Sequence, residues 1–189
     1  MKVGVLALQG AFAEHIHVLS KLGVQSILVR LPQNLIGIDS LIIPGGESTT
    51  INKLLTEYNL RKPLINLIAS GMPVLGICAG TIILAKTVAE TEIDSLNAVD
   101  MEVKRNAFGR QLDSFEIDLN IPVLGKNKFH GIFIRAPLIQ KTFNGVQILC
   151  QFRNHPVMVR QNNVIAATFH PELTEDLRFH RYFLNLVNG

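Results

Sequence analysis

The sequence predicts an α/β fold in which a doubly wound, mostly parallel central sheet carries helices on both faces. In the first half, short apolar runs alternate with segments whose apolar residues recur at helical spacing, as in repeated βα units. Of the 189 residues, 48% are hydrophobic and 17% are charged, and the mean hydropathy is +0.28. Such a composition is typical of strands buried on both faces. Short strands with tight turns in the second half predict some additional antiparallel pairing.

Four strands are predicted in the first half, at 2–8, 24–31 and 40–43 and in a short run that begins at Pro73 and leads into Cys78. Helices are expected at 12–22, 48–58 and 63–70, and again over the apolar segment 81–88 that follows Cys78. Right-handed crossovers between parallel strands place the working site at the carboxyl ends of the strands. The segments Gln9-Gly10 and Pro44 to Ser48 and the residue Cys78 should therefore meet.

The second half contains more strands than helices. Strands are predicted at 99–104, 114–119, 131–135, 146–151, 156–160 and 164–169. A final helix is expected at 174–187, packing through Leu177, Phe183, Leu184 and Val187. Because no internal repeat, low-complexity stretch or linker interrupts the chain, we expect one domain over residues 1–189.

Charge and cysteine usage exclude several classes of protein. The formal net charge is +3, but the basic residues are scattered, so no nucleic-acid partner is expected. The apolar start is too short for a signal peptide and is interrupted by Gln9-Gly10. No run approaches the ~18 apolar residues of a membrane span. We therefore expect a cytoplasmic protein with two free thiols, Cys78 and Cys150, no membrane partner, no cofactor and no bound metal.

The most informative segment is Gly76-Ile77-Cys78-Ala79-Gly80. Its layout of strand, sharp turn and helix matches the G-x-S-x-G elbow of hydrolases, with cysteine as the central residue. Glycines flank such a residue because a neighbouring Cβ would collide with the strand or the helix. The start of the helix favours thiolate, so Cys78 is a candidate nucleophile.

A nucleophilic cysteine needs a base and a group that orients this base. Of the six histidines, His170 is the best candidate because Phe169-His170-Pro171-Glu172 follows a predicted strand. If the extended conformation persists, Glu172 shares a face with His170 and can reach Nδ1, which leaves Nε2 for Cys78. His15 and His17 lie two apart on a helix and are poorly placed to share a metal ion.

Each of these features has an ordinary structural interpretation as well. An isolated buried cysteine is usually a small hydrophobic residue, and a lone His-Pro-Glu is usually a loop. Their combination with the glycine-flanked elbow favours catalysis. Cys150 has no such setting and is expected in the core.

A second glycine-rich strand end, Pro44-Gly45-Gly46-Glu47-Ser48, lacks the lysine of a nucleotide-binding P-loop. Its better use is to bring a backbone N–H close to a reacting carbonyl. Together with the N–H of Ala79 it would form an oxyanion hole, in which the loss of one donor typically costs ~3 kcal/mol of barrier. A simple helix-capping turn at Ser48 and Thr49 remains an alternative.

These motifs resemble the class I, triad-type glutamine amidotransferases, whose fold is flavodoxin-like. More closely, the chain resembles the glutaminase subunits of pyridoxal 5′-phosphate synthase. The matching segments extend over nearly the whole chain and lie at 5–11, 44–50, 76–80, 105–111, 113–116, 133–137 and 169–174. Two departures occur, at Thr81, where the family more often has an aliphatic residue, and in the turn Gln161-Asn162-Asn163.

The resemblance implies a role for each matching position. Cys78 would be the nucleophile, His170 the general base and acid, and Glu172 the residue that orients His170. Gly46 and Ala79 would form the oxyanion hole. The residues implied to bind glutamine are Gly46, Glu47, Ser48, Arg105, Ile134 and Arg135.

The implied reaction is hydrolysis of the side-chain amide of L-glutamine through a thioester, which releases glutamate and ammonia. The implied partner is a (β/α)₈-barrel synthase subunit that uses the ammonia to build pyridoxal 5′-phosphate in a hetero-oligomeric complex. One alternative is a cysteine-elbow stress-response protein, similar to glyoxalases, intracellular proteases and redox sensors. Those proteins usually place an acidic residue near the first strand, where this chain has Gln9. Another alternative is a regulatory subunit with an inactive triad.

Overall fold

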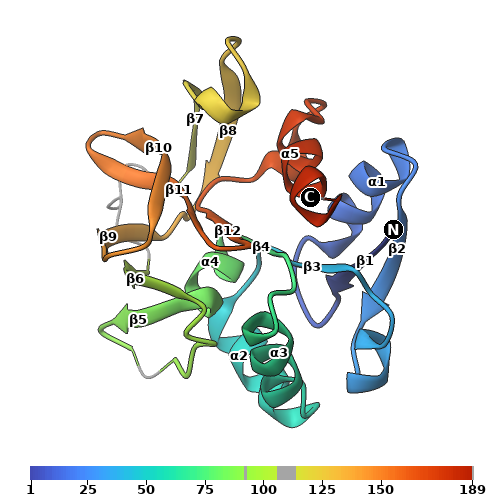
Figure 1. The fold of residues 1–189 in the computed structure, drawn as a ribbon. Helices are drawn as coiled ribbons and strands as arrows, with labels where there is room; N and C mark the ends of the chain where they lie inside the picture. Colours follow the sequence, from blue (N-terminus) through green and yellow to red (C-terminus); the bar gives the residue numbers. More distant parts are fainter. Residues whose placement is uncertain (92, 106–113, 189) are drawn as a thin grey trace.

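The computed structural model describes residues 1–91, 93–105 and 114–188, and its centre is a seven-stranded sheet (Figure 1). The strand order is β10 (Gln147–Phe152), β11 (His155–Gln161), β12 (Val164–Ala167), β4 (Val74–Ile77), β3 (Ser40–Ile43), β1 (Lys2–Leu6) and β2 (Gln25–Val29). The strands from β12 to β2 are parallel, whereas β10, β11 and β12 pair antiparallel. The predicted mostly parallel sheet is therefore confirmed.

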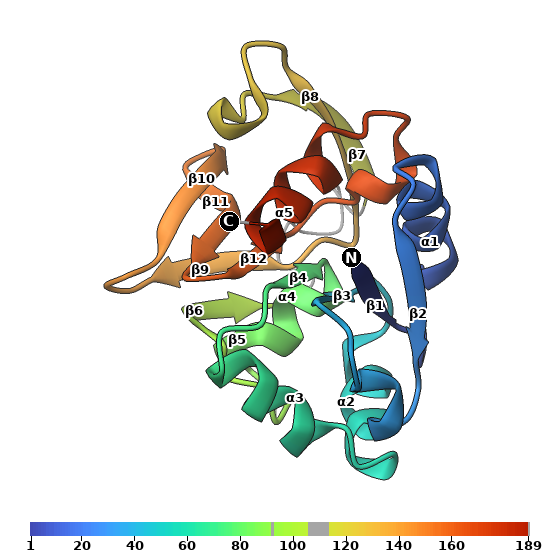
Figure 2. The same cartoon turned by 45° about the vertical axis from the view of Figure 1, so that its right-hand side comes forward.

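Helices cover both faces of this sheet, as predicted (Figures 1 and 2). One face packs against α2 (Ser48–Glu57), α3 (Arg61–Ala69), the short α4 (Ala79–Leu84) and the 3₁₀ helix η1 (Pro32–Leu35). The other packs against α1 (Phe12–Lys21) and α5 (Arg178–Asn188). Successive side chains of a strand point to opposite faces of the sheet. Leu41 and Ile43 of β3 accordingly pack on the face covered by α2 and α3, and Ile42 packs on the face covered by α1 and α5.

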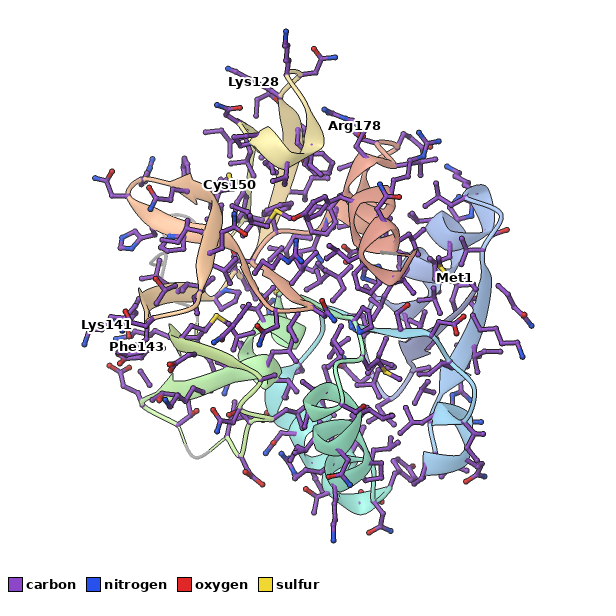
Figure 3. The ribbon with its side chains drawn as sticks, in the orientation of Figure 1. Met1, Lys128, Lys141, Phe143, Cys150 and Arg178 are labelled. Atoms are coloured by element: carbon purple, nitrogen blue, oxygen red, sulfur yellow. The ribbon has the colours of Figure 1, made fainter. Side chains whose placement is uncertain are left out.

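Two smaller sheets flank the centre. The first contains β5 (Ala85–Ala89), β6 (Val99–Lys104) and β9 (Leu138–Thr142), and the second pairs β7 (Ser114–Leu119) with β8 (Phe129–Ile134). The 3₁₀ helix η2 (Pro122–Leu124) lies between β7 and β8. At the start of α5, Arg178 Nη2 donates to the carbonyl of Lys128 at 2.9 Å, which ties α5 to the segment before β8; Figure 3 labels both residues. Phe129, Phe169 and Phe179 pack together and attach the β7–β8 pair to the core.

The observed elements differ from the expected ones in three places. The helix expected at 81–88 ends at Leu84, because residues from Ala85 onward pair with β6 as strand β5. Strand β9 was not expected. The final helix begins at Arg178 rather than near residue 174, since the 3₁₀ helix η3 (Pro171–Leu173) and an Asp176 cap precede it. No helix among the described residues is long and apolar enough to cross a membrane.

The core between α1 and α5 contains a pair of histidines. His15 and His180 are both fully buried, and His15 Nδ1 lies 3.0 Å from His180 Nε2. Burial lowers the pKa of His180 to about 4. Burial lowers the pKa of His15 well below its usual value, and repulsion between its protonated form and protonated His180 or His170 lowers it further. Both imidazoles are therefore neutral at pH 7.

This pair should make the protein sensitive to acid. As pH falls below about 6.5, the unfolded chain binds protons that the folded chain does not, so stability is lost down to about pH 4. We expect His180→Gln to reduce the loss of unfolding free energy between pH 7 and pH 4 by about 3 kcal/mol. Urea unfolding at several pH values measures this, with His17→Gln on the exposed side of α1 as the control. An unchanged pH dependence in His180→Gln would contradict the expectation.

Candidate active site

Cys78 lies at a strained turn between β4 and α4. Its backbone has φ 50° and ψ −101°, an unusual conformation for a residue with a side chain. The backbone N–H of Cys78 donates to the carbonyl of Ala167 at 2.8 Å. A Cβ on Gly76 would lie 2.8 Å from the carbonyl oxygen of Gly80, and one on Gly80 would lie 2.2 Å from that of Ile43. Both glycines are therefore required by close contacts, as expected.

Thr81 extends this arrangement one residue into α4. Its hydroxyl is buried, lies 2.7 Å from the carbonyl of Ala167 and 3.2 Å from that of Gly76. The threonine at this departure from the family pattern therefore ties α4 to two strands of the sheet.

His170 and Glu172 lie together at the end of β12. His170 Nδ1 is 2.7 Å from Glu172 Oε1, and both side chains are nearly inaccessible to solvent. The expected contact between His170 and Glu172 is present. The expected extended backbone between them is wrong, because the chain forms the 3₁₀ helix η3 there. The backbone N–H of His170 donates to the carbonyl of Ile132 at 2.8 Å and fixes the position of the turn.

The surroundings of His170 favour its charged form. Burial alone would lower the pKa of His170, but its hydrogen bonds to Cys78 and Glu172 and the charges of these groups outweigh burial. The pKa of His170 rises to about 10. The imidazole therefore carries a proton on both nitrogens at neutral pH.

The glycine-rich loop after β3 approaches the same imidazole. A Cβ on Gly45 would lie 2.5 Å from His170 Cε1 and 3.4 Å from Cys78 Cβ. The carbonyl of Gly45 accepts a hydrogen bond from the N–H of Ala11 at 2.9 Å. Gln9 Oε1 accepts from the N–H of Glu47 at 2.7 Å. Sequence reasoning missed this role of Gln9, although its place at the end of β1 was a signal that it lies near the loop.

These elements enclose a cavity of about 470 Å³. Every predicted site residue except Glu172, which lies behind His170, lines it. The lining residues are Gln9, Gly10, Ala11, Gly45, Gly46, Glu47, Ser48, Cys78, Ala79, Ile82, Arg105, Ile134, Arg135 and His170.

Arg105 and Glu47 form an ion pair at the cavity. Arg105 Nη2 lies 3.0 Å from Glu47 Oε1. Glu47 also caps α2, where it accepts from the N–H groups of Thr49 and Thr50. The small cost of burial raises the pKa of Glu47, but the hydrogen bonds from both threonines outweigh it and lower the pKa to about 2. The cavity therefore contains a fixed negative charge beside a fixed positive one.

The end of β8 forms another wall. The carbonyl oxygen of Ile134 lies 3.8 Å from Cys78 Sγ, and Arg135 has a positive φ of 44°. Of the matching segment 105–111, only Arg105 lies within the described residues.

The other candidate residues lie outside this cavity. Cys150, labelled in Figure 3, is buried beside β7 with Sγ 3.4 Å from the carbonyl of Asn120. Burial raises the pKa of its thiol to about 11, against the weaker effect of a backbone hydrogen bond from Gln151. His130 is exposed and contacts Glu116 and Asp118 across the β7–β8 pair. No cluster of side chains suited to a metal ion occurs among the described residues.

Comparison with known proteins agrees with this geometry. The SNO glutamine amidotransferase family matches residues 5–188. The chain is 56% identical over 184 residues to the pyridoxal 5′-phosphate synthase subunit PdxT of Pelotomaculum thermopropionicum, covering 97% of this chain and 94% of the relative. It is 52% identical over 187 residues to the PdxT subunit of Moorella thermoacetica, covering 99% and 100%.

Solved structures give the same result. A crystal structure described as a glutamine amidotransferase superposes with a TM-score of 0.94 at 48% identity, over 99% of each chain. A putative GMP synthase subunit from Thermoplasma acidophilum shares the fold, with a TM-score of 0.70 at 18% identity over 100% of this chain and 94% of that chain. The chain therefore belongs to the SNO glutamine amidotransferase family.

Proposed function

We propose that this chain hydrolyses the side-chain amide of L-glutamine to glutamate and ammonia, with Cys78, His170 and Glu172 as its catalytic triad. The observation that carries the proposal is the 2.7 Å contact between His170 Nδ1 and Glu172 Oε1 beside an elbow cysteine. This arrangement matches a nucleophile, a base and an orienting acid. Membership of the SNO family supports the substrate, since its members are glutamine amidotransferases.

The reaction follows from these groups. Cys78 Sγ attacks the carboxamide carbon of glutamine and forms a tetrahedral oxyanion. When the C–N bond breaks, protonated His170 gives its Nε2 proton to the departing nitrogen, and ammonia leaves. Water, deprotonated by the now neutral His170, cleaves the thioester and releases glutamate and the Cys78 thiolate. Acid–base help of this kind contributes ~10²–10⁴-fold.

Two backbone N–H groups are suited to stabilise the oxyanion. Ala79 is the first residue of α4, so its N–H has no acceptor within the helix. The Gly45 carbonyl is directed to Ala11, and because a trans peptide points its N–H the opposite way, the Gly46 N–H is directed away from Ala11. Both Gly46 and Ala79 line the cavity.

Glutamine is a zwitterion, and the cavity offers both charges that it needs. The guanidinium of Arg105 suits the α-carboxylate, while the carboxylate of Glu47 suits the α-ammonium group. The backbone of Gly46, Glu47 and Ser48 and of Ile134 and Arg135 would hold the remainder of the substrate. The Arg105–Glu47 pair then opens when glutamine binds.

Ammonia needs a consumer, because in water it is lost as ammonium. The relatives are subunits of pyridoxal 5′-phosphate synthase, so we assign this chain the role of ammonia supplier in such a complex. The partner would be a (β/α)₈-barrel synthase subunit in the cytoplasm, and the whole chain would act as one amidotransferase domain. The family match supports this function and not the stress-response alternative.

Removing the nucleophile tests the proposal directly. Cys78→Ala should lower glutamate release by at least about 10⁴-fold, because no other group in the cavity can form the thioester. Cys150→Ala is the matched control and should keep activity within a few-fold, since Cys150 lies outside the cavity. The measurement is glutamate release with the synthase subunit present. Residual activity near the wild-type level in Cys78→Ala rejects the triad, and no activity in the wild type favours the regulatory-subunit alternative.

Glu172→Gln should leave the fold intact and lower kcat by about 10²- to 10⁴-fold, because the imidazolium loses its counter-charge. In the wild type the alkaline limb of kcat/KM is expected near pH 10, where His170 loses its proton. In the variant this limb should move to lower pH, since the carboxylate that raises the pKa of His170 is gone. The exposed Glu175, paired with Lys21, provides the control Glu175→Gln. Identical pH profiles for wild type and Glu172→Gln would remove Glu172 from the triad.

Arg105→Lys should raise KM for glutamine by about 10-fold with little change in kcat, because lysine lacks the planar fork that binds both carboxylate oxygens. Steady-state kinetics measure both constants. Arg160→Lys, on β11 and outside the cavity, is the control. An unchanged KM would show that the substrate carboxylate binds elsewhere.

A further inference from the structure

Behind Glu172, on the side away from His170, lies a buried polar group without an assigned role. His15 of α1 is fully buried, and its Nε2 is 3.8 Å from Glu172 Oε2. The other ring nitrogen, Nδ1, is 3.0 Å from Nε2 of His180 on α5. Neither Glu172 Oε2 nor His15 Nε2 has a hydrogen-bond partner among the described residues. Two buried polar atoms that lack hydrogen-bond partners within the described ranges therefore face each other at 3.8 Å.

The protons on this pair can be assigned from physical arguments. A neutral imidazole has one donor and one acceptor nitrogen, so His15 and His180 share one hydrogen bond in one of two directions. If His15 Nδ1 donates to His180, a lone pair of His15 Nε2 faces a buried carboxylate, and His180 Nδ1–H is left as a buried donor without a partner in the described part of the chain. If His180 donates instead, His15 Nε2–H points its positive end at Glu172 Oε2. The second arrangement has the lower energy.

We propose that His15 is a positioning residue for glutamine hydrolysis, which acts by directing Nε2–H at Oε2 of Glu172. This inference rests on the proposed function. A separation of 3.8 Å is longer than a hydrogen bond, so the contact is electrostatic and a small shift closes it. The contact with His15 restrains rotation of the Glu172 carboxylate, so Oε1 stays hydrogen-bonded to His170 Nδ1. Nε2 of His170 therefore stays directed at Cys78. The titratable groups that face His15 are Glu172 of η3, His170 before η3 and His180 of α5.

Two substitutions at this one position separate positioning from packing. The amide nitrogen of His15→Gln can replace Nε2 and reach Glu172, whereas the amide of His15→Asn replaces Nδ1 and reaches only His180. We expect His15→Asn to lower kcat by about 10- to 100-fold, with KM for glutamine unchanged. We expect His15→Gln to stay within a few-fold of wild type. His17→Asn, on the exposed side of the same helix, controls for a change in α1.

The assay is glutamate release with the synthase subunit present, together with the pH profile of kcat/KM. In His15→Asn the alkaline limb should move to lower pH, because the carboxylate spends less time on His170 Nδ1. Three outcomes overturn the proposal: equal activity in both variants at the wild-type level, equal loss in both, or greater loss in His15→Gln. A wild-type complex that releases no glutamate would instead refute the proposed function.

A measurement on the wild-type protein covers the case in which neither variant folds. The ¹⁵N chemical shifts of the histidine rings distinguish the two neutral tautomers. His15 should carry its proton on Nε2 and have an unprotonated Nδ1. The opposite tautomer, or a charged His15 at pH 7, overturns the proposal regardless of any activity.

Discussion

The close approach of α4 to β3 and β4 is the constraint on which the site depends. The backbone at Gly80 touches the carbonyl of Ile43, and the backbone at Gly76 touches Gly80, so no side chain fits at either glycine. Between these glycines the chain reverses at Cys78, whose φ is positive. Its strain is held by hydrogen bonds from the Cys78 N–H and the Thr81 hydroxyl to Ala167. The nucleophile is thus exposed to the cavity by packing rather than by an open loop.

The loops around Cys78 are fixed because their backbone groups are paired. The N–H of Ala11 donates to the carbonyl of Gly45 and joins the loops after β1 and β3, and Gln9 Oε1 accepts from the N–H of Glu47 in the loop after β3. His170 is fixed to β8 through Ile132. Backbone hydrogen bonds therefore hold together a site assembled from segments far apart in sequence, and such positioning is what electrostatic stabilisation of a transition state requires.

Sequence alone predicts what depends on local pattern and on strand ends. The parallel sheet, the elbow and the partnership of His170 with Glu172 follow from apolar period, glycine spacing and a two-residue separation. The sequence could not show that the helix ends at Leu84, because a short apolar run is compatible with both a helix and a strand. Pairing with β6 makes the residues after Leu84 a strand. Nor could the sequence show that Glu172 reaches His170 through a 3₁₀ turn, or that His15 and His180, 165 residues apart, lie within hydrogen-bond distance. Those contacts depend on how α1 and α5 pack, and no local pattern encodes that packing.

One buried carboxylate faces two histidines at different distances, which helps to explain why His170 is charged and His15 is neutral. Glu172 is 2.7 Å from His170 and 3.8 Å from His15, so its charge stabilises a proton on His170 more strongly. The hydrogen bond and the charge of Cys78 also raise the pKa of His170. Once His170 is charged, its own field opposes a second proton on His15, where burial already disfavours charge. Burial is therefore the main reason that His15 stays neutral, and repulsion from His180 and His170 adds to it. A neutral imidazole is the form that can donate to Glu172 without competing for its charge.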